Sequence, residues 1–183
     1  MRPSSPREAL FSFLCTSNNH ILRITPMVRT LASYGIQDEF PTLDRLAEIT
    51  EDELRTKGFG YRAKTIPHAA RQIIEKGGEE WLSELKSKPY DEAIHSLLEL
   101  SGVGPKLADC ICLFALDKME SVPVDTHVWQ AACRVYFPEF EGKSVTAARY
   151  KAIGDHLRTK FGDRAAWVQQ FLFYGNLTMK KKS

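Results

Sequence analysis

Apolar residues recur every three or four positions along most of the chain, the spacing that places side chains on one face of an α-helix. One such series consists of Ile21, Ile24, Val28 and Leu31. Runs in which apolar and polar residues alternate, as they do in a half-buried strand, are scarce. The pattern therefore predicts an all-α fold.

Capping residues mark the ends of several helices in the first half of the chain. Thr50 and Glu53 have the spacing of a capping box, which predicts a short helix over residues 51–57. A longer amphipathic helix is predicted over 61–76. Pro67 lies inside this segment, and because proline lacks a backbone N–H, we expect it to bend the helix or to delay its start.

A tight turn with two glycines separates two further predicted helices. The first covers 91–100 and ends at the segment Gly102 to Gly104. Pro105 then suits the first turn of the second helix, which is expected to run to about Leu116. The sequence therefore predicts two helices joined by a short hairpin.

The last third of the chain begins with a segment that lacks helical spacing. Residues 117–124 are expected to be extended, and they lead to Asp125, whose carboxylate stands where it can cap a helix over 126–136. Further helices are predicted over 145–161 and 164–177.

Composition narrows the protein class without identifying a partner. The chain has 183 residues and 43% hydrophobic content, which suffices for one globular domain with its own core. Its formal net charge of +2 neither indicates nor excludes binding to nucleic acid. The four cysteines have neither the spacing of a zinc site nor the density of a secreted disulfide scaffold, so we expect a reducing compartment and no metal.

The sequence contains few targeting signals. The N-terminal residues lack the apolar segment of a secretory leader, and no segment approaches the length of a membrane span, so we expect an intracellular protein without a membrane partner. The segment 178–183 is expected to be a basic tail, because it contains Lys180, Lys181 and Lys182. So short a run carries little weight as a nuclear address.

The residues best suited to chemistry lie at and after the glycine hairpin. Gly102, Val103 and Gly104 let the backbone approach a ligand, and the next helix presents unpaired N–H groups that suit a phosphate. Lys106 follows at the start of that helix, where we expect burial and the positive helix end to disfavour its ammonium form. A neutral amine can attack carbon, although a lysine after such a turn can also simply contact phosphate.

Asp125 supplies a carboxylate that could orient the lysine and stabilise positive charge on a reacting sugar. Its alternative role is that of an ordinary N-cap, which it can fill at the same time. A lysine nucleophile with a carboxylate partner is therefore the hypothesis that the residues themselves support.

These motifs resemble a known superfamily. The segment from Leu100 to Lys106, followed by Val122-Pro123-Val124-Asp125, resembles the helix-hairpin-helix and catalytic aspartate of the DNA glycosylases. Within that superfamily the chain looks most like the 8-oxoguanine DNA glycosylases with lyase activity. This closer resemblance rests on the segments 11–19, 58–63, 108–113 and 167–173.

The resemblance implies a reaction and a set of catalytic residues. Lys106 would attack C1′ of the damaged nucleotide, expel 8-oxoguanine, and form a Schiff base from which β-elimination nicks the strand. Asp125 would hold Lys106 and stabilise the developing sugar cation. No cofactor is implied, although the hairpin carbonyls could hold a monovalent cation. The implied partner is damaged double-stranded DNA, bound by a monomer.

The resemblance also assigns the residues that contact DNA. An enzyme of this kind must extrude its target base and fill the gap in the duplex. The residues that match the family's contacts to the DNA are Asn18, Arg23, Tyr61, Arg62, Gly102, Val103, Gly104 and His127. In the family the asparagine and the arginines face the orphaned cytosine, the tyrosine wedges the stack, and the histidine contacts a phosphate.

The flipped purine is expected to bind a separate set of residues, Cys110, Pro123, Gln169 and Phe173. Cys110 lies four positions after Lys106 and therefore on the same face of the helix. Without the resemblance, Cys110 and Phe173 would be interpreted as core residues, since buried cysteine and phenylalanine are common.

The sequence departs from the family's pattern at two places. Ser101 stands where the family commonly has proline, but both hairpin glycines are present. The resemblance covers the helical core, whereas eukaryotic members carry a β-rich domain before this core. We expect a single domain over 1–183 with two lobes, one over about 24–105 and one formed by 6–23 with 106–177, and a DNA-binding cleft between them.

Other interpretations remain open at the level of sequence. The chain has no cysteine after Cys133, which disfavours the iron-sulfur branch of the superfamily. A short archaeal-type enzyme or another glycosylase of different base specificity is an alternative. A truncated noncatalytic module, in which Lys106 and Asp125 form only an ion pair, is another. The nucleus is the favoured location, with the mitochondrion as the alternative.

Overall fold

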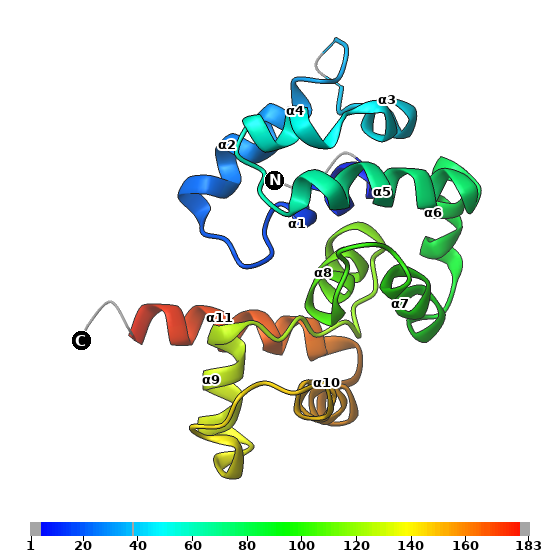
Figure 1. The fold of residues 1–183 in the computed structure, drawn as a ribbon. Helices are drawn as coiled ribbons and strands as arrows, with labels where there is room; N and C mark the ends of the chain where they lie inside the picture. The colour runs from blue at the N-terminus through cyan, green and yellow to red at the C-terminus, as the bar shows by residue number, and fades with distance from the viewer. Residues whose placement is uncertain (1–4, 38, 180–183) are drawn as a thin grey trace. The chain divides into compact units, whose positions relative to one another are not determined.

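The computed structural model describes residues 5–37 and 39–179, and within them the chain folds into helices and turns without a strand (Figure 1). This confirms the predicted all-α fold. The α-helices are α1 (Pro6–Leu14), α2 (Ile21–Ala32), α3 (Leu43–Glu48), α4 (Glu51–Thr56), α5 (Arg62–Glu75), α6 (Gly78–Ser87), α7 (Tyr90–Leu98), α8 (Pro105–Ala115), α9 (Thr126–Val135), α10 (Ala147–Phe161) and α11 (Ala165–Met179). Two short 3₁₀ helices are η1 (Pro138–Phe140) and η2 (Gly162–Arg164).

The chain divides into two compact units, of which unit 1 extends to Leu116 and unit 2 begins at Asp117. In unit 1, α3 packs against α5, and α1 packs against α8 (Figure 1). In unit 2, α9 and α10 both pack against α11. The expected lobes divide the chain differently, since they placed α1 with the C-terminal helices. The lobes and the cleft between them stay predictions.

Each unit has its own apolar core. The core of unit 1 contains fully buried side chains from several helices, among them Phe11, Leu54 and Ile66. The core of unit 2 is smaller and includes Val128 from α9 and Leu157 from α10. Removing such side chains from water supplies the main force that holds helices of this length together.

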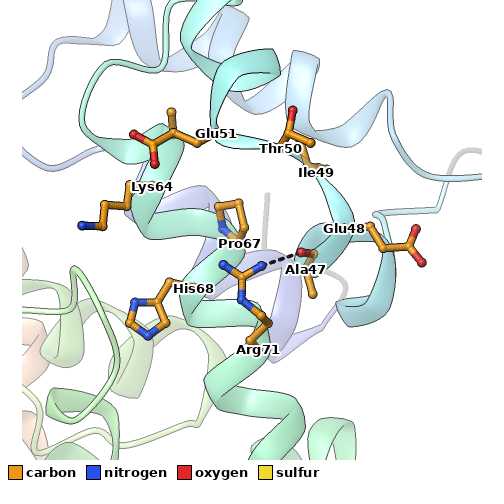
Figure 2. A pocket seen from close by; sticks show the side chains of 10 residues that line it. Ala47, Glu48, Ile49, Thr50, Glu51, Lys64, Pro67, His68 and Arg71 are labelled. Carbon is orange, nitrogen blue, oxygen red and sulfur yellow. Dashed lines mark hydrogen bonds between the residues drawn. The ribbon is translucent and has the colours of Figure 1, made fainter.

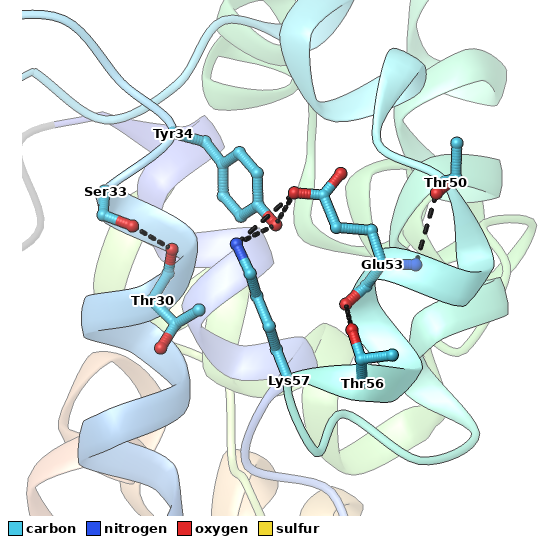
Figure 3. A network of polar contacts seen from close by, with 7 residues as sticks. All are labelled: Thr30, Ser33, Tyr34, Thr50, Glu53, Thr56 and Lys57. Atoms are coloured by element: carbon cyan, nitrogen blue, oxygen red, sulfur yellow. Dashed lines mark hydrogen bonds and ion pairs between the residues drawn. The ribbon is translucent and has the colours of Figure 1, made fainter.

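Helix ends follow the predicted capping chemistry with one difference. The hydroxyl of Thr50 accepts a hydrogen bond from the backbone N–H of Glu53 at 3.2 Å, as predicted. The Glu53 carboxylate, however, does not complete the capping box. It accepts from the Tyr34 hydroxyl at 2.7 Å and from the Lys57 ammonium at 3.3 Å, which ties α4 to the turn after α2 (Figure 3).

Several helix boundaries differ from those predicted. Pro67 lies inside α5 and does not delay its start, because the helix begins at Arg62. The chain forms α6 directly after α5, and this helix was not predicted; its Trp81, Leu82 and Leu85 are buried. The predicted tail begins too early, since α11 extends to Met179. Lys180, Lys181 and Lys182 lie outside the described residues.

Candidate active site

The glycine hairpin joins α7 to α8 and is anchored to α5. Gly102 has φ of +79°, which is the left-handed conformation that favours glycine. The N–H of Ser101 donates to the Gln72 side chain at 2.8 Å, and the N–H of Val103 donates to Leu100 at 3.1 Å. The turn is therefore fixed both by its own backbone and by a side chain of α5.

Gly102 also has no space for a side chain. A Cβ atom at this position would overlap Cγ2 of Thr65 in α5 and would lie 3.3 Å from Cδ2 of Leu14 in α1. Gly104 differs, because its φ is negative and nothing lies within 4 Å of the corresponding Cβ position. The two glycines thus have different structural roles. Gly102 allows the turn to pack closely against α5 and α1, and Gly104 leaves the backbone accessible.

Lys106 occupies the first turn of α8. The helix begins at Pro105, as the sequence predicted, and Gly104 is its N-cap. Lys106 is half-buried, and Cys110 one turn later is buried. The two side chains leave the helix on the same face, so the structure of unit 1 places a candidate nucleophile next to a candidate contact for the base.

Arg62 is buried, which the sequence did not indicate. Only 4% of its surface is exposed, and its guanidinium donates to the backbone carbonyls of Leu14, at 3.2 Å, and Ser17. The positive charge of Arg62 also faces Cys15, where burial raises the pKa of the thiol to about 12 and the arginine partly opposes that rise. Arg62 therefore holds the end of α1 and the turn that leads to Asn18.

The other three residues expected to fill the gap in the duplex lie around this turn. Tyr61 is about half exposed and donates from its hydroxyl to the carbonyl of Ser17 at 3.0 Å. Asn18 is exposed and has φ of +45°. Arg23 is exposed, and its guanidinium lies 3.4 Å from the carbonyl of Gly58. Unit 1 thus brings together residues that are far apart in the sequence.

In unit 2, Asp125 is the N-cap of α9, as predicted. Its Oδ1 accepts a hydrogen bond from the N–H of Val128 at 2.8 Å, and the side chain is half-buried. The extended segment before it is held by Tyr150 of α10, whose hydroxyl accepts from the N–H of Val124 at 3.3 Å. The capping bond fixes the carboxylate, and Oδ2 remains the oxygen that can serve a reacting group.

Gln169 of α11 contacts Pro123, which lies in the segment before α9. Gln169 is 4% exposed, and its Nε2 donates to the carbonyl of Pro123 at 3.1 Å. Its Oε1 accepts from the side chain of Gln170 at 2.8 Å. Both ends of the Gln169 amide are therefore oriented, which is what a group that reads the edge of a base requires.

Phe173 lies one turn further along α11 and contacts His127 of α9. The ring centroids are 5.3 Å apart at an interplanar angle of 81°, an edge-to-face arrangement. Sequence reasoning missed the residue that supports this pair, Asn176, which lies three positions after Phe173 and contacts His127. The helical spacing of Gln169, Phe173 and Asn176 could have revealed it.

The predicted site residues are divided between the two units. Unit 1 holds Lys106 and Cys110 with the hairpin, and it also holds the residues expected to face the opposite base. Unit 2 holds Asp125 with the remaining residues. Because Lys106 and Asp125 belong to different units, their pairing stays a prediction.

Unit 1 also contains a hollow of about 500 Å³ (Figure 2). Lys64, His68 and Arg71 of α5 line one side, and Glu48 and Glu51 line the other. The Arg71 guanidinium donates to the carbonyl of Ala47 at 2.8 Å and so caps the end of α3. No predicted site residue lines this hollow.

Two kinds of feature are absent from the described residues: a cluster of metal-binding side chains and a helix that could span a membrane. Residues 5–37 and 39–179 contain no group of three histidine, cysteine or acidic side chains placed to hold a metal ion. In the same residues, no helix is long and apolar enough to cross a bilayer. The hairpin carbonyls of Leu100 and Gly104 accept backbone N–H groups, and binding of a monovalent cation there stays a prediction.

Known proteins are similar to this chain in both sequence and fold. The chain is 42% identical to the N-glycosylase/DNA lyase OGG1 of Arabidopsis thaliana over 96% of its own length and 51% of that protein. It is 36% identical to the N-glycosylase/DNA lyase of Saccharomyces cerevisiae over 92% of its length and 54% of that protein. The chain therefore spans about half the length of these curated relatives.

A solved structure agrees with these sequence relatives. It is that of the Clostridium acetobutylicum 8-oxoguanine glycosylase/lyase with double-stranded DNA that contains cytosine opposite 8-oxoguanine. It matches with a TM-score of 0.81 and 31% identity, over 96% of this chain and 61% of that one. The family of HhH-GPD superfamily base excision DNA repair proteins matches residues 11–153. The chain therefore belongs to the HhH-GPD superfamily of base excision DNA repair proteins.

Proposed function

We propose that this chain removes 8-oxoguanine from duplex DNA and then cleaves the strand, as an N-glycosylase with lyase activity. The observation that carries the proposal is Lys106 in the first turn of α8, directly after the hairpin, in a chain 42% identical to a protein named N-glycosylase/DNA lyase. A glycosylase that uses only water needs no amine at this position. A lyase does, because its intermediate is a Schiff base.

The reaction follows from the chemistry of an amine and a sugar. The Lys106 amine forms a bond to C1′ while the bond from C1′ to the base breaks, and the base leaves with the electron pair and takes up a proton. The amine loses a proton, and the bond from C1′ to the ring oxygen O4′ breaks as nitrogen forms a double bond to C1′. O4′ takes up a proton, and the product is the Schiff base. Removal of a proton from C2′ then expels the 3′ phosphate by β-elimination.

Asp125 supports both the lysine and the charge that develops on the sugar. Its Oδ1 is held by the N–H of Val128, so the carboxylate does not have to be ordered when the substrate binds. A fixed negative charge stabilises a cationic sugar more than a mobile one does. We assign Asp125 this electrostatic role and the role of orienting Lys106.

The damaged base and its partner are assigned to different groups of residues. Gln169 presents an oriented amide to the extruded purine, together with Cys110, Pro123 and the Phe173 ring. Asn18, Arg23, Tyr61 and Arg62 are assigned to the gap opposite cytosine. Among the two arginines, the exposed Arg23 is the better candidate for a direct contact, because the donors of Arg62 already bind two carbonyls.

The remaining assignments concern the phosphate contacts, the oligomeric state, the cofactors and the location of the protein. The hairpin glycines and His127 hold phosphates of the DNA. The protein acts as a monomer and requires no cofactor, with a monovalent cation at the hairpin carbonyls as an accessory. It works inside the cell, in the nucleus or the mitochondrion.

Trapping with sodium borohydride tests the proposal. The purified chain is mixed with a duplex that contains 8-oxoguanine opposite cytosine, and borohydride reduces the Schiff base to a stable crosslink. We expect a shifted protein–DNA band from the wild type and none from Lys106→Gln. We expect Asp125→Asn to release the base at least about a hundredfold more slowly.

Each other outcome rejects a defined part of the proposal. A full crosslink with Lys106→Gln would reject Lys106 as the nucleophile. A crosslink with another damaged purine but not with 8-oxoguanine would keep the lyase chemistry and reject the substrate. Binding to DNA without any crosslink would favour a noncatalytic module.

A further inference from the structure

Asn176 of α11 lies at the centre of a polar network in unit 2. It is 2% exposed, and three residues of α9 surround its side-chain amide. Oδ1 accepts from the Arg134 guanidinium at 2.5 Å, whereas Nδ2 lies 3.1 Å from Oε1 of Gln130 and 3.2 Å from Nδ1 of His127. A buried amide with all of these contacts is rigid, because turning it over would break every one of them.

Arg134 determines which way the amide points. A guanidinium has only donors, so the atom that faces it must be an acceptor, the Oδ1 of Asn176. Nδ2 must then point toward Gln130 and His127, and it carries one hydrogen for each of them. The orientation thus follows from the chemistry of the partners.

The orientation of the amide in turn fixes the proton on His127. Because an N–H of Asn176 points at Nδ1, this ring nitrogen must accept and therefore carries no hydrogen. The hydrogen of the neutral ring is then on Nε2. The Phe173 ring packs edge-to-face on the imidazole and restricts its rotation.

We propose that Asn176 is a positioning residue that holds His127 as the neutral tautomer with its proton on Nε2. His127 then offers DNA a hydrogen-bond donor without a positive charge. The part of the inference that concerns DNA rests on the proposed function, whereas the tautomer itself does not. His127 is half-buried, so part of its ring remains accessible to a ligand.

A neutral donor and a cation differ in one measurable property. A cation that binds a phosphate releases a counterion and adds about 0.9 to the slope of log affinity against log salt concentration. A neutral donor adds affinity without changing that slope. The tautomer therefore predicts how binding depends on salt.

Nitrogen-15 NMR of the histidine rings in the full chain tests the tautomer directly. His127→Gln identifies the signals of His127 among those of the histidines. At neutral pH we expect a protonated Nε2 and an unprotonated Nδ1. A proton on Nδ1, alone or together with one on Nε2, would overturn the proposal even if no variant of Asn176 folds.

Asn176→Asp is the matched variant, because it replaces a donor with a group of the same shape that only accepts. We expect His127 to take up a proton from solvent on Nδ1, where it donates to the new carboxylate, and to keep the proton on Nε2, which gives an imidazolium. Unchanged ring signals in a folded Asn176→Asp protein would show that Asn176 does not position His127.

Binding to a duplex with an uncleavable abasic-site analogue opposite cytosine extends the test to DNA. We expect His127→Gln to lower affinity about fivefold at an unchanged salt slope. Asn176→Asp is expected to raise the slope by about one. A slope reduced by about one in His127→Gln would contradict a neutral histidine. A wild type that binds no duplex would reject the proposed function and leave the NMR result intact.

Discussion

The polar residues of the candidate site are held by different kinds of hydrogen bond in the two units. In unit 1, Arg62 and Tyr61 donate to backbone carbonyls at the end of α1. In unit 2, Asn176 bonds to side chains of α9, and the Gln169 amide bonds to one carbonyl and one side chain.

This difference predicts different consequences of mutation. Removing a side chain that satisfies buried carbonyls leaves polar groups of the backbone unpaired, so its cost falls on the free energy of unfolding. Removing a member of a side-chain network instead changes which atoms donate and accept. We therefore expect substitutions in unit 1 to affect stability most, and substitutions around Asn176 to affect the chemistry of the site.

Gly102→Ala should produce the largest loss of stability. The added Cβ would overlap Thr65, and the alanine would have to adopt a positive φ. We therefore expect a loss of about 3 kcal/mol in the free energy of unfolding. Urea denaturation measures this change. Gly104→Ala is the matched control and should have a small effect, because its Cβ meets nothing and its φ is negative.

A second substitution tests whether the overlap itself is the cause. Thr65→Ser removes Cγ2 and keeps the hydroxyl that donates to Tyr61. Combined with Gly102→Ala, it should recover part of the lost stability. If the double variant is as unstable as Gly102→Ala, the loss comes from the backbone conformation alone.

Arg62→Met should follow, with a loss of about 2 kcal/mol. Methionine fills much of the volume but leaves the carbonyl of Leu14 without the Arg62 donor, and the carbonyl of Ser17 with only the Tyr61 hydroxyl. Arg23→Met is the control, since Arg23 is exposed and should change stability by less than about 0.5 kcal/mol. Equal midpoints of urea denaturation for the two variants would remove the distinction between a buried and an exposed arginine.

Tyr150→Phe is the corresponding test in unit 2, because its hydroxyl holds the backbone at Val124. We expect a loss of about 1 kcal/mol in thermal or urea denaturation, the usual contribution of one neutral hydrogen bond. Tyr174→Phe on the exposed face of α11 should have no measurable effect. A loss as large as that of Arg62→Met would show that backbone contacts matter equally in both units.

The smallest effect should come from acid titration of the network in Figure 3. The hydrogen bond from Tyr34 and the contact with Lys57 lower the pKa of Glu53 below its ordinary value of 4.5. A carboxyl with a lowered pKa stabilises the fold above its unfolded-state pKa, and this contribution disappears as the pH falls through the folded-state pKa. Urea midpoints measured from pH 6 to pH 3 should therefore decrease less for Glu53→Gln than for the wild type.

Local patterns in the sequence determined the helices, the hairpin and the position of the two candidate catalytic residues. The spacing of apolar residues, the glycine with positive φ at 102 and the cap at Asp125 involve neighbours within a few positions, so they can be recognised without a fold. The unpredicted α6 marks the limit of this approach, because its N-cap is a glycine and provides no capping side chain.

The tertiary structure alone decided which polar side chains are buried and what they contact. Arg62 donates to a carbonyl 48 positions away, and Asn176 contacts a histidine 49 positions away. No local pattern predicts either partner, since the sequence alone is equally consistent with a surface position for an arginine or an asparagine in a helix. Their roles arise when helices pack and bury a polar group, which must then find a partner because leaving it unpaired costs free energy.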